Sequence, residues 1–274
     1  MFVVTGPTGN VGREVLAELV ERGVRVRAVV RDPASAAPIE GAELVRGDLT
    51  EPATLGPALR GADGAFLLPG YPGLAEAARA AGIRRIVQLS GGSAGSADLT
   101  NAVTRYMRRT ETEMRETNLE WTVLRPTAFM SNALRWKAQI AAGDVVRLPF
   151  ADVPLAVVHP SDIAAVAATA LLEDGHQSMI YRPTGPEALL PEEQVAILAK
   201  ALGRPLRFQA QSNAEARRTM LQNTPPEYVA AFLDFYVNGS LDETTVRPTV
   251  EDVTGRSART FLEWATRNAS KFDS

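Results

Sequence analysis

Three glycines spaced three residues apart, Gly6, Gly9 and Gly12, could hold a phosphate-bearing ligand against the backbone near the start of the chain. They directly follow the apolar run Phe2–Thr5 and open Val11–Arg22, a segment with apolar residues at helical spacing. Glycine permits a tight turn and a close approach of the backbone to a pyrophosphate, and the N–H groups at the helix start then face the phosphates. The spacing therefore predicts a dinucleotide-binding loop; the alternative is a strand-to-helix turn that holds no ligand.

The end of the second predicted strand, Arg25–Val30, distinguishes between the two nicotinamide dinucleotides. A site for the unphosphorylated form has an acidic residue about 20 positions further on, which accepts from the ribose 2′-hydroxyl. Arg31 stands there instead, and its planar guanidinium can pair with a 2′-phosphate. Asp32 precedes a proline and is expected to shape the turn. The pattern predicts a preference for NADP(H); the alternative is an arginine on a solvated loop.

Residues at the ends of the next two strands are expected to contact the rest of the dinucleotide. Asp48 could accept from the adenine amino group, with Leu49 against the ring; alternatively, Asp48 caps the next helix. Leu67 and Leu68 end the fourth predicted strand, where the chain would pass beneath the dinucleotide.

The sequence lacks one pair of residues that could transfer a proton at such a cofactor, a tyrosine and a lysine spaced Tyr-x-x-x-Lys. In that pair the lysine lowers the pKa of the tyrosine, so that the phenol acts as a general acid near neutral pH. None of the five tyrosines is followed by a lysine four positions later. The catalytic group is therefore unknown, with Ser90 and Tyr106 as weak candidates. The alternative is that the Ser90 hydroxyl caps the backbone and that Tyr106 is an interfacial helix residue.

Composition excludes several other kinds of site. The 274 residues include no cysteine and two histidines, which leaves no thiolate nucleophile, no disulfide and no histidine-rich metal centre. The net charge is −3 with both signs interspersed, so no basic surface for nucleic acid is expected. There is no basic leader before the first strand, and no apolar run approaches the roughly 20 residues that span a bilayer. We therefore expect a cytoplasmic protein with neither a membrane nor a nucleic-acid partner.

The elements that must position these residues alternate between short apolar runs and helical patterns. Such alternation predicts an α/β fold, a Rossmann-type doubly wound parallel sheet. The predicted strands of this part are Phe2–Thr5, Arg25–Val30, Glu43–Arg46, Ala65–Leu68, Arg85–Leu89 and Trp121–Arg125. The predicted helices are Val11–Arg22, Leu55–Arg60, Leu74–Ala81 and Val103–Thr117.

After Pro126 the chain has many helical patterns and few strands, which predicts a smaller, mostly helical C-terminal lobe over the carboxyl edge of the sheet. We assign residues 1–176 to the dinucleotide-binding domain and 177–274 to the lobe that covers the substrate, with the two interleaved around 127–160. The predicted elements are the helices Ser161–Leu172 (with Ser161 as N-cap), Glu192–Leu202, Ala214–Gln222, Glu227–Asn238 and Ala258–Ala269, and the strands Met179–Pro183 and Leu206–Gln209.

Residues after the sixth strand could line a substrate pocket. Phe129, Met130 and Trp136 are apolar or aromatic, which suits a flat hydrophobic molecule such as a quinone. The alternative for Phe129 and Met130 is plain core packing. His159 and Asp162 could perform acid–base chemistry, although their place before an alanine-rich helix favours capping and packing.

Several motifs together resemble the NmrA-like group of atypical short-chain dehydrogenase/reductases. They are TGPTGNVG, VVRDP, RGDLTEP, VQLSGGS, TETEMRETNLEWTVLRPTAFMSN, VVHPSDIAAVAA, YRPTGPEALLPEEQ and VTGRSARTFLEWA, which run nearly end to end. The resemblance implies a Rossmann-type domain with a small C-terminal lobe and a bound nicotinamide cofactor. It places Arg31 at the 2′-phosphate, Ser90 near the nicotinamide ribose and Pro126 to Phe129 beside the nicotinamide face. The residues that it places in the phosphate loop are Gly6, Thr8, Gly9, Asn10, Val11 and Gly12.

The resembled group includes quinone, arylmethane-dye and ketone reductases, and also proteins that bind the cofactor and regulate partners. The sequence therefore predicts an NADPH-dependent oxidoreductase that transfers hydride to a quinone, an aromatic ketone or a similar conjugated carbonyl without the Tyr-x-x-x-Lys pair. The alternative is an NADP(H)-binding, redox-sensing regulator without turnover, which would have a protein partner. An epimerase of nucleotide sugars is disfavoured, because that chemistry in related folds also depends on the missing pair.

Overall fold

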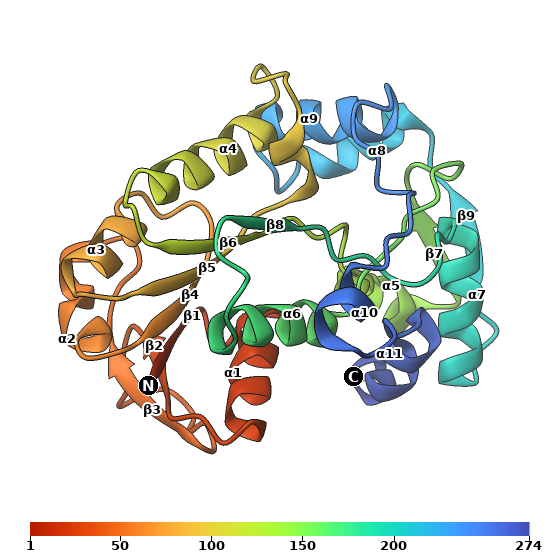
Figure 1. Ribbon diagram of the computed structural model, residues 1–274. Coiled ribbons are helices and arrows are strands. Elements are labelled where there is room, and N and C mark those ends of the chain that lie inside the picture. The colour runs from red at the N-terminus through yellow and green to blue at the C-terminus, as the bar shows by residue number, and fades with distance from the viewer. Residues whose placement is uncertain (274) are drawn as a thin grey trace.

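Apolar residues on both faces of the strands produce a sheet that is covered by helices on both sides. In the computed structural model, which describes residues 1–273, seven parallel strands pair in the order β3-β2-β1-β4-β5-β6-β8 (Figure 1). The strands are β1 (Phe2–Thr5), β2 (Val26–Val30), β3 (Ala42–Arg46), β4 (Gly64–Leu67), β5 (Arg85–Leu89), β6 (Glu120–Leu124) and β8 (Met179–Tyr181). The order reverses between β1 and β4, and such a switch point is where open α/β sheets bind ligands.

Successive residues of each strand point to opposite faces and enter two separate cores. Val4 packs among residues of α1 (Gly12–Glu21) and α6 (Pro160–Leu172), whereas Val3 packs on the other face. The helices of that second face are η1 (Pro52–Leu55), α2 (Gly56–Leu59), α3 (Leu74–Ala80) and α4 (Ala102–Arg115), with the short η2 (Gly92–Gly95) beside α4. Figure 1 shows α1 and α6 side by side on the opposite side of the sheet from α2, α3 and α4.

A third core forms the smaller lobe, beside α6 in Figure 1. It draws residues from both sides of β8 in the sequence. Its elements are η3 (Met130–Trp136), α5 (Lys137–Ala142), β7 (Val145–Leu148), α7 (Pro191–Leu202), β9 (Arg207–Ala210), α11 (Phe261–Arg267) and η4 (Ala269–Phe272). Strands β7 and β9 form a two-stranded parallel sheet. The helices α8 (Asn213–Met220) and α9 (Pro226–Tyr236) extend the lobe towards α4, and α10 (Thr249–Thr254) packs on α6.

The predicted elements of the first half match those observed to within a few residues, except that two short helical turns, η1 and α2, replace the helix predicted at Leu55–Arg60. Farther along, β7, α5 and α10 were missed, and α11 begins at Phe261 rather than Ala258 because Thr260 caps it. The prediction that Ser161 is the N-cap of α6 is wrong: His159 is the cap, and its ring accepts a hydrogen bond from the Ser161 N–H. The division at residue 176 stays a prediction, although β8 lies beyond it and pairs with β6.

Candidate active site

The glycine loop after β1 is folded tightly on itself. Gly6 has a φ of +62°, and its carbonyl accepts from the Gly9 N–H at 3.0 Å. A Cβ on Gly12 would lie 2.1 Å from the Gly6 carbonyl oxygen, so no larger residue fits there without a backbone shift. Glycine is therefore needed at both positions for different reasons. Gly6 has a positive φ, and Gly12 allows the start of α1 to lie close to the backbone that follows β1.

Three consecutive amides at the start of α1 are left without a hydrogen-bond partner in the described part of the chain. No described group accepts a hydrogen bond from the N–H groups of Asn10, Val11 or Gly12. Val11, the N-cap, has no side-chain acceptor, whereas helix starts are usually satisfied by such a group or by a ligand. Free donors at the positive end of a helix are the arrangement that binds a pyrophosphate, so this loop fits a dinucleotide.

A cavity of about 440 Å³ opens beside this loop, at the ends of β2 and β3. Of the predicted cofactor residues, it is lined by Gly6, Thr8, Arg31, Asp48, Leu49 and Leu68. The Arg31 side chain is exposed and has no hydrogen bond or ion pair with a described residue. The Asp32 carboxylate accepts from the Ala34 N–H at 3.1 Å and so shapes the turn. The cavity thus offers one unpaired guanidinium where a 2′-phosphate is expected.

Asp48 is held by its own loop. Its Oδ1 accepts from the Thr50 Oγ1 at 2.7 Å and from the Thr50 N–H at 2.9 Å, and these hydrogen bonds keep the pKa of Asp48 below its usual value. Asp48 is therefore charged and fixed in position at neutral pH. It lines the cavity as an acceptor, and its contact with adenine stays a prediction.

Of the two leucines at the end of β4 that were expected to contact the dinucleotide, only Leu68 lines the cavity. Leu67 is fully buried in the core under α2 and α3, so its side chain is turned away from the cavity that Leu68 lines. Tyr71, which sequence reasoning did not single out, lines the same cavity and offers an aromatic face. Its place just after the end of β4, at the carboxyl edge, is the signal that could have identified it.

The hydroxyl of Ser90 is occupied by a buried carboxylate. Ser90 Oγ donates to Glu111 Oε1 at 2.7 Å, and Arg125 binds both oxygens of Glu111 at 2.8 and 2.7 Å. Glu111 is 1% exposed and Ser90 4% exposed. This network ties β5, α4 and the end of β6 together, which is a structural use of the serine.

The phenol of Tyr106 is occupied as well. It donates to the Pro69 carbonyl at 3.0 Å, and the ring fills the space where a Cβ on Gly70 would lie. Burial raises the pKa of Tyr106 above its usual value, the opposite of what an acid near neutral pH requires.

A buried tyrosine–glutamate pair, Tyr236 and Glu243, contacts the loop after β6, and sequence reasoning did not identify Glu243. Tyr236 donates to Glu243 Oε2 at 2.8 Å, the Glu243 carboxylate also accepts from the Ala128 N–H, and burial raises the pKa of Glu243. Pro126 is buried, and Phe129 is half-buried and packs against the core formed with α1 and α6. Met130 is 1% exposed within the small-lobe core, and Trp136 packs on that core.

The described residues form neither a candidate metal site nor a candidate membrane-spanning helix. No group of three or more metal-ligating side chains occurs within residues 1–273. Over the same range, no helix is both long and apolar enough to cross a membrane.

Comparisons with known proteins agree with this geometry. Residues 6–174 match the NAD(P)H-binding family. The chain is 40% identical to a (4-alkanoyl-5-oxo-2,5-dihydrofuran-3-yl)methyl phosphate reductase of Streptomyces griseus, with 99% of both chains covered. It is 35% identical to an NAD(P)H azoreductase of Xenophilus azovorans, again over 99% of both. The crystal structure of an NADPH-dependent quinone oxidoreductase of Escherichia coli in complex with NADPH has the same fold, with a TM-score of 0.81 and 23% identity over 97% of this chain and 99% of that one.

Because the family match covers more than half of the chain and both relatives align end to end, the chain belongs to the NAD(P)H-binding family and is an NAD(P)H-dependent reductase.

Proposed function

We propose that this reductase prefers NADPH and transfers hydride to a conjugated acceptor, such as a quinone, an aromatic ketone or a similar conjugated carbonyl. The observation that carries the proposal is that both acid candidates named from the sequence are occupied by other protein groups, Ser90 by Glu111 and Tyr106 by the Pro69 carbonyl. The buried Glu243 beside the loop after β6 is likewise bound by Tyr236 and the Ala128 N–H. An isolated carbonyl needs an acid as the hydride arrives. A conjugated acceptor spreads the new electron pair over its π system and takes its proton from water.

When bound, NADPH supplies the hydride from C4 of its dihydronicotinamide ring. The protein's task is then to bind and orient. The free amides of Asn10, Val11 and Gly12 would hold the pyrophosphate, and Arg31 the 2′-phosphate. Phe129 would offer an apolar surface beside the reacting faces. Fixing two reactants in a productive geometry can supply most of the acceleration of such a step.

The names of the relatives support this acceptor class. An oxo-dihydrofuran, an azo compound and a quinone are the acceptors that the names of three relatives imply. Each has a double bond within a conjugated system, over which the electron pair that arrives with the hydride can spread. Such acceptors do not require a strong acid from the protein, which matches the hydrogen bonding at Ser90 and Tyr106.

The test is stopped-flow absorbance at the reduced-nicotinamide band. Protein loaded with NADPH or NADH is mixed with a panel of quinones, conjugated lactones, azo dyes and polycyclic aromatic ketones, with an unconjugated cyclohexanone as the control acceptor. We expect rapid oxidation of NADPH by at least one conjugated compound and none by cyclohexanone. Tight NADPH binding with no oxidation by any compound would contradict the proposal and favour a regulator.

The cofactor preference has its own variant. Arg31→Gln should lower NADPH affinity about tenfold and leave NADH affinity unchanged, because one charge-assisted contact to a phosphate is lost. Arg46→Gln is the matched control, since Arg46 is also exposed, ends the neighbouring strand β3 and does not line the cavity. An equal loss of affinity for both dinucleotides in Arg31→Gln would remove Arg31 as the reader of the 2′-phosphate.

A further inference from the structure

The loop after β6, residues 126–129, lies where the nicotinamide end of a bound dinucleotide is expected. Arg31 and its cavity lie at the ends of β2 and β3, and the free amides of the glycine loop follow β1. A dinucleotide that crosses the switch point from there extends towards the ends of β4, β5 and β6. The backbone of this loop is therefore in a position to contact the nicotinamide.

Main-chain hydrogen bonds hold the loop on two sides. The Thr127 N–H donates to the Pro183 carbonyl at 3.2 Å, and the Ala128 carbonyl accepts from the Val158 N–H at 2.9 Å. The Thr127 hydroxyl donates to the Ala156 carbonyl at 2.5 Å. The loop therefore follows a fixed path between the segment after β8 and the segment before α6.

The Ala128 N–H is bound differently, by the side chain of Glu243. This residue lies in the segment that links α9 to α10 (Figure 1). Its carboxylate accepts from the Ala128 N–H and, through Oε2, from the Tyr236 hydroxyl at 2.8 Å. Its main-chain carbonyl accepts from the Ala156 N–H at 2.7 Å. Glu243 is thus fixed through both its backbone and its side chain, and it fixes the Ala128 amide in turn.

The burial of Glu243 is costly, which distinguishes it from a residue that only packs. It is 7% exposed and has no ion pair with a described residue, and its neighbour Asp242 is also acidic. A buried carboxyl without a cation destabilises a fold unless hydrogen bonds offset the cost. An apolar side chain would fill the same space without that cost. The purpose of the carboxyl therefore lies in the hydrogen bonds that it makes to Tyr236 and Ala128.

The direction of the Ala128 N–H determines the direction of the adjoining carbonyl. The Thr127 carbonyl and the Ala128 N–H belong to one trans peptide group, so they point in opposite directions. Because the N–H is directed at Glu243, the Thr127 carbonyl is directed away from it, and no described group donates to that oxygen. The loop thus presents an acceptor whose direction is set by Glu243.

We propose that Glu243 is a positioning residue of this reductase: it aims the Thr127 carbonyl at the carboxamide NH2 group of the nicotinamide, an assignment that rests on the proposed function. The carboxamide offers two N–H donors, and an acceptor fixed in place selects one orientation of the ring. The orientation of the ring decides which face of its C4 meets the substrate and at what distance. Glu243 acts through the peptide group rather than by contact with the reactants.

The experiment compares NADP⁺ with its 3-acetylpyridine analogue, in which a methyl ketone replaces the carboxamide and no N–H donor remains. Isothermal calorimetry measures the affinity of the full-length protein for each. We expect the parent to bind NADP⁺ about fivefold more tightly than the analogue, since the analogue loses one hydrogen bond. In Glu243→Gln the preference should fall below about twofold, because an amide has one acceptor oxygen for two donors and no longer fixes the peptide.

A second variant, Tyr236→Phe, tests the same contact and keeps the carboxyl. It deletes the hydroxyl that holds Glu243 Oε2, so the preference should fall to an intermediate value. Tyr181→Phe is the matched control, because the Tyr181 hydroxyl also has a single partner, His176 Nδ1 at 2.7 Å, and lies against the core formed with α1 and α6. It should keep the preference of the parent. A variant that only destabilises the fold, as measured by urea unfolding, should lose affinity for both dinucleotides in the same ratio.

Two results would overturn the proposal. The first is an equal affinity of the parent for the two dinucleotides, because the carboxamide would then have no acceptor. The second is a preference in Glu243→Gln as large as in Tyr181→Phe and the parent; if Glu243→Gln does not fold, Tyr236→Phe decides in the same way. Binding of the oxidised dinucleotides requires no turnover. A failure of every conjugated acceptor would therefore contradict the proposed function, while a lost preference in Glu243→Gln would still support the role of Glu243.

Discussion

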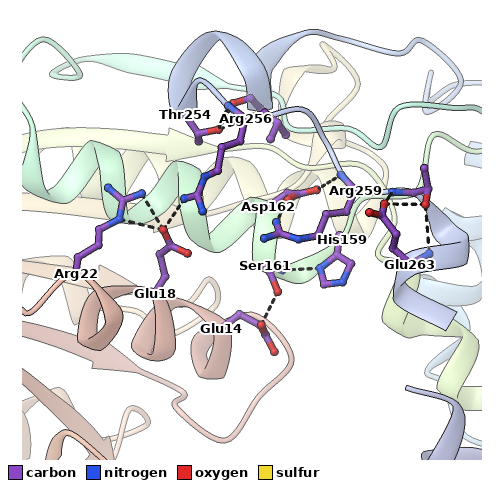
Figure 2. Close-up of polar contacts among 12 residues, drawn as sticks. Glu14, Glu18, Arg22, His159, Ser161, Asp162, Thr254, Arg256, Arg259 and Glu263 are labelled. Atoms are coloured by element: carbon purple, nitrogen blue, oxygen red, sulfur yellow. Dashed lines mark hydrogen bonds and ion pairs between the residues drawn. The ribbon is translucent and has the colours of Figure 1, made fainter. Parts of the chain in front are cut away.

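The two helices that lie side by side on one face of the sheet, α1 and α6, begin in opposite ways. At α1 the N-cap is Val11, which has no acceptor, and three amides stay free. At α6 the N-cap is His159, whose ring accepts from the Ser161 N–H. The helices start at the same end of the layer and are joined there by the hydrogen bond from Ser161 to Glu14 (Figure 2).

The difference shows that one helix start is kept for ligand binding, whereas the neighbouring one stabilises the fold. The first turn of α1 keeps its donors for a ligand and depends on glycine packing for its shape. The first turn of α6 satisfies its donors internally, and its Asp162 is paired with Arg259, which leads into α11. In this pair of helices, the start that keeps its amides free is the one that fits a ligand, whereas the capped start has an architectural role.

The largest effect on the start of α1 is expected from Gly12→Ala. The new Cβ would press on the carbonyl oxygens of Gly6 and Thr5, so the loop would have to move. We expect a loss of about 3 kcal/mol or more in the free energy of unfolding and a fall in NADPH affinity of about a hundredfold, because at least two amide–phosphate contacts are displaced. Urea unfolding and fluorescence titration measure both. Gly56→Ala is the control, since no atom lies within 4 Å of its Cβ position; equal behaviour of the two variants would contradict the packing argument.

A change of pH should act on α6. The pKa of His159 is lowered by burial from 6.5 to about 4, so between these values the unfolded chain binds the proton more tightly than the folded one. The free energy of unfolding is therefore unaffected by His159 above about pH 6.5. It decreases as the pH falls towards about 4, by at most about 3 kcal/mol.

The variant His159→Asn isolates this effect, because asparagine keeps a capping acceptor and does not titrate. Urea unfolding at about pH 7.5 and about pH 4.5 should show a smaller difference for the variant than for the parent. Identical differences would mean that the imidazole does not carry the acid sensitivity.

The smallest expected effect comes from the link between the helices. Ser161→Ala removes the hydrogen bond to Glu14 and should lower the free energy of unfolding by about 1.5 kcal/mol, since a partly buried hydrogen bond to a carboxylate is lost. NADPH affinity should stay that of the parent, because the amides of α1 are untouched. Ser270→Ala, at an exposed serine, controls for the substitution itself. A fall in NADPH affinity with unchanged stability would show that the link positions the loop.

Local patterns predicted what local physics determines. The glycine loop follows from a strand, a turn and a helix within the first 22 residues, and it was predicted with the correct start of α1 to within a residue. The cap of α6 had a local signal too: a proline at the first helical position, Pro160, identifies the residue before it as the cap. Serine's general preference for caps obscured that signal.

Other parts of the site depend on contacts that no local pattern contains. The partner of Ser90, Glu111, is 21 residues away, and the partner of the Tyr106 phenol is a carbonyl 37 residues away. An apolar residue such as Met130 satisfies the pattern of a pocket and that of a core equally well, and only the packing of the small lobe places it inside that lobe.

The path of the chain has a mechanical consequence. The chain leaves the sheet after β6, builds η3, α5 and β7, returns through α6 and β8, and leaves again for α7. After α9 it returns once more to pack α10 on α6 before ending in α11 and η4. Neither lobe can come apart without pulling strands or helices out of the other, so heat or urea should melt both in one cooperative transition. A protease cut between them should release no stable fragment.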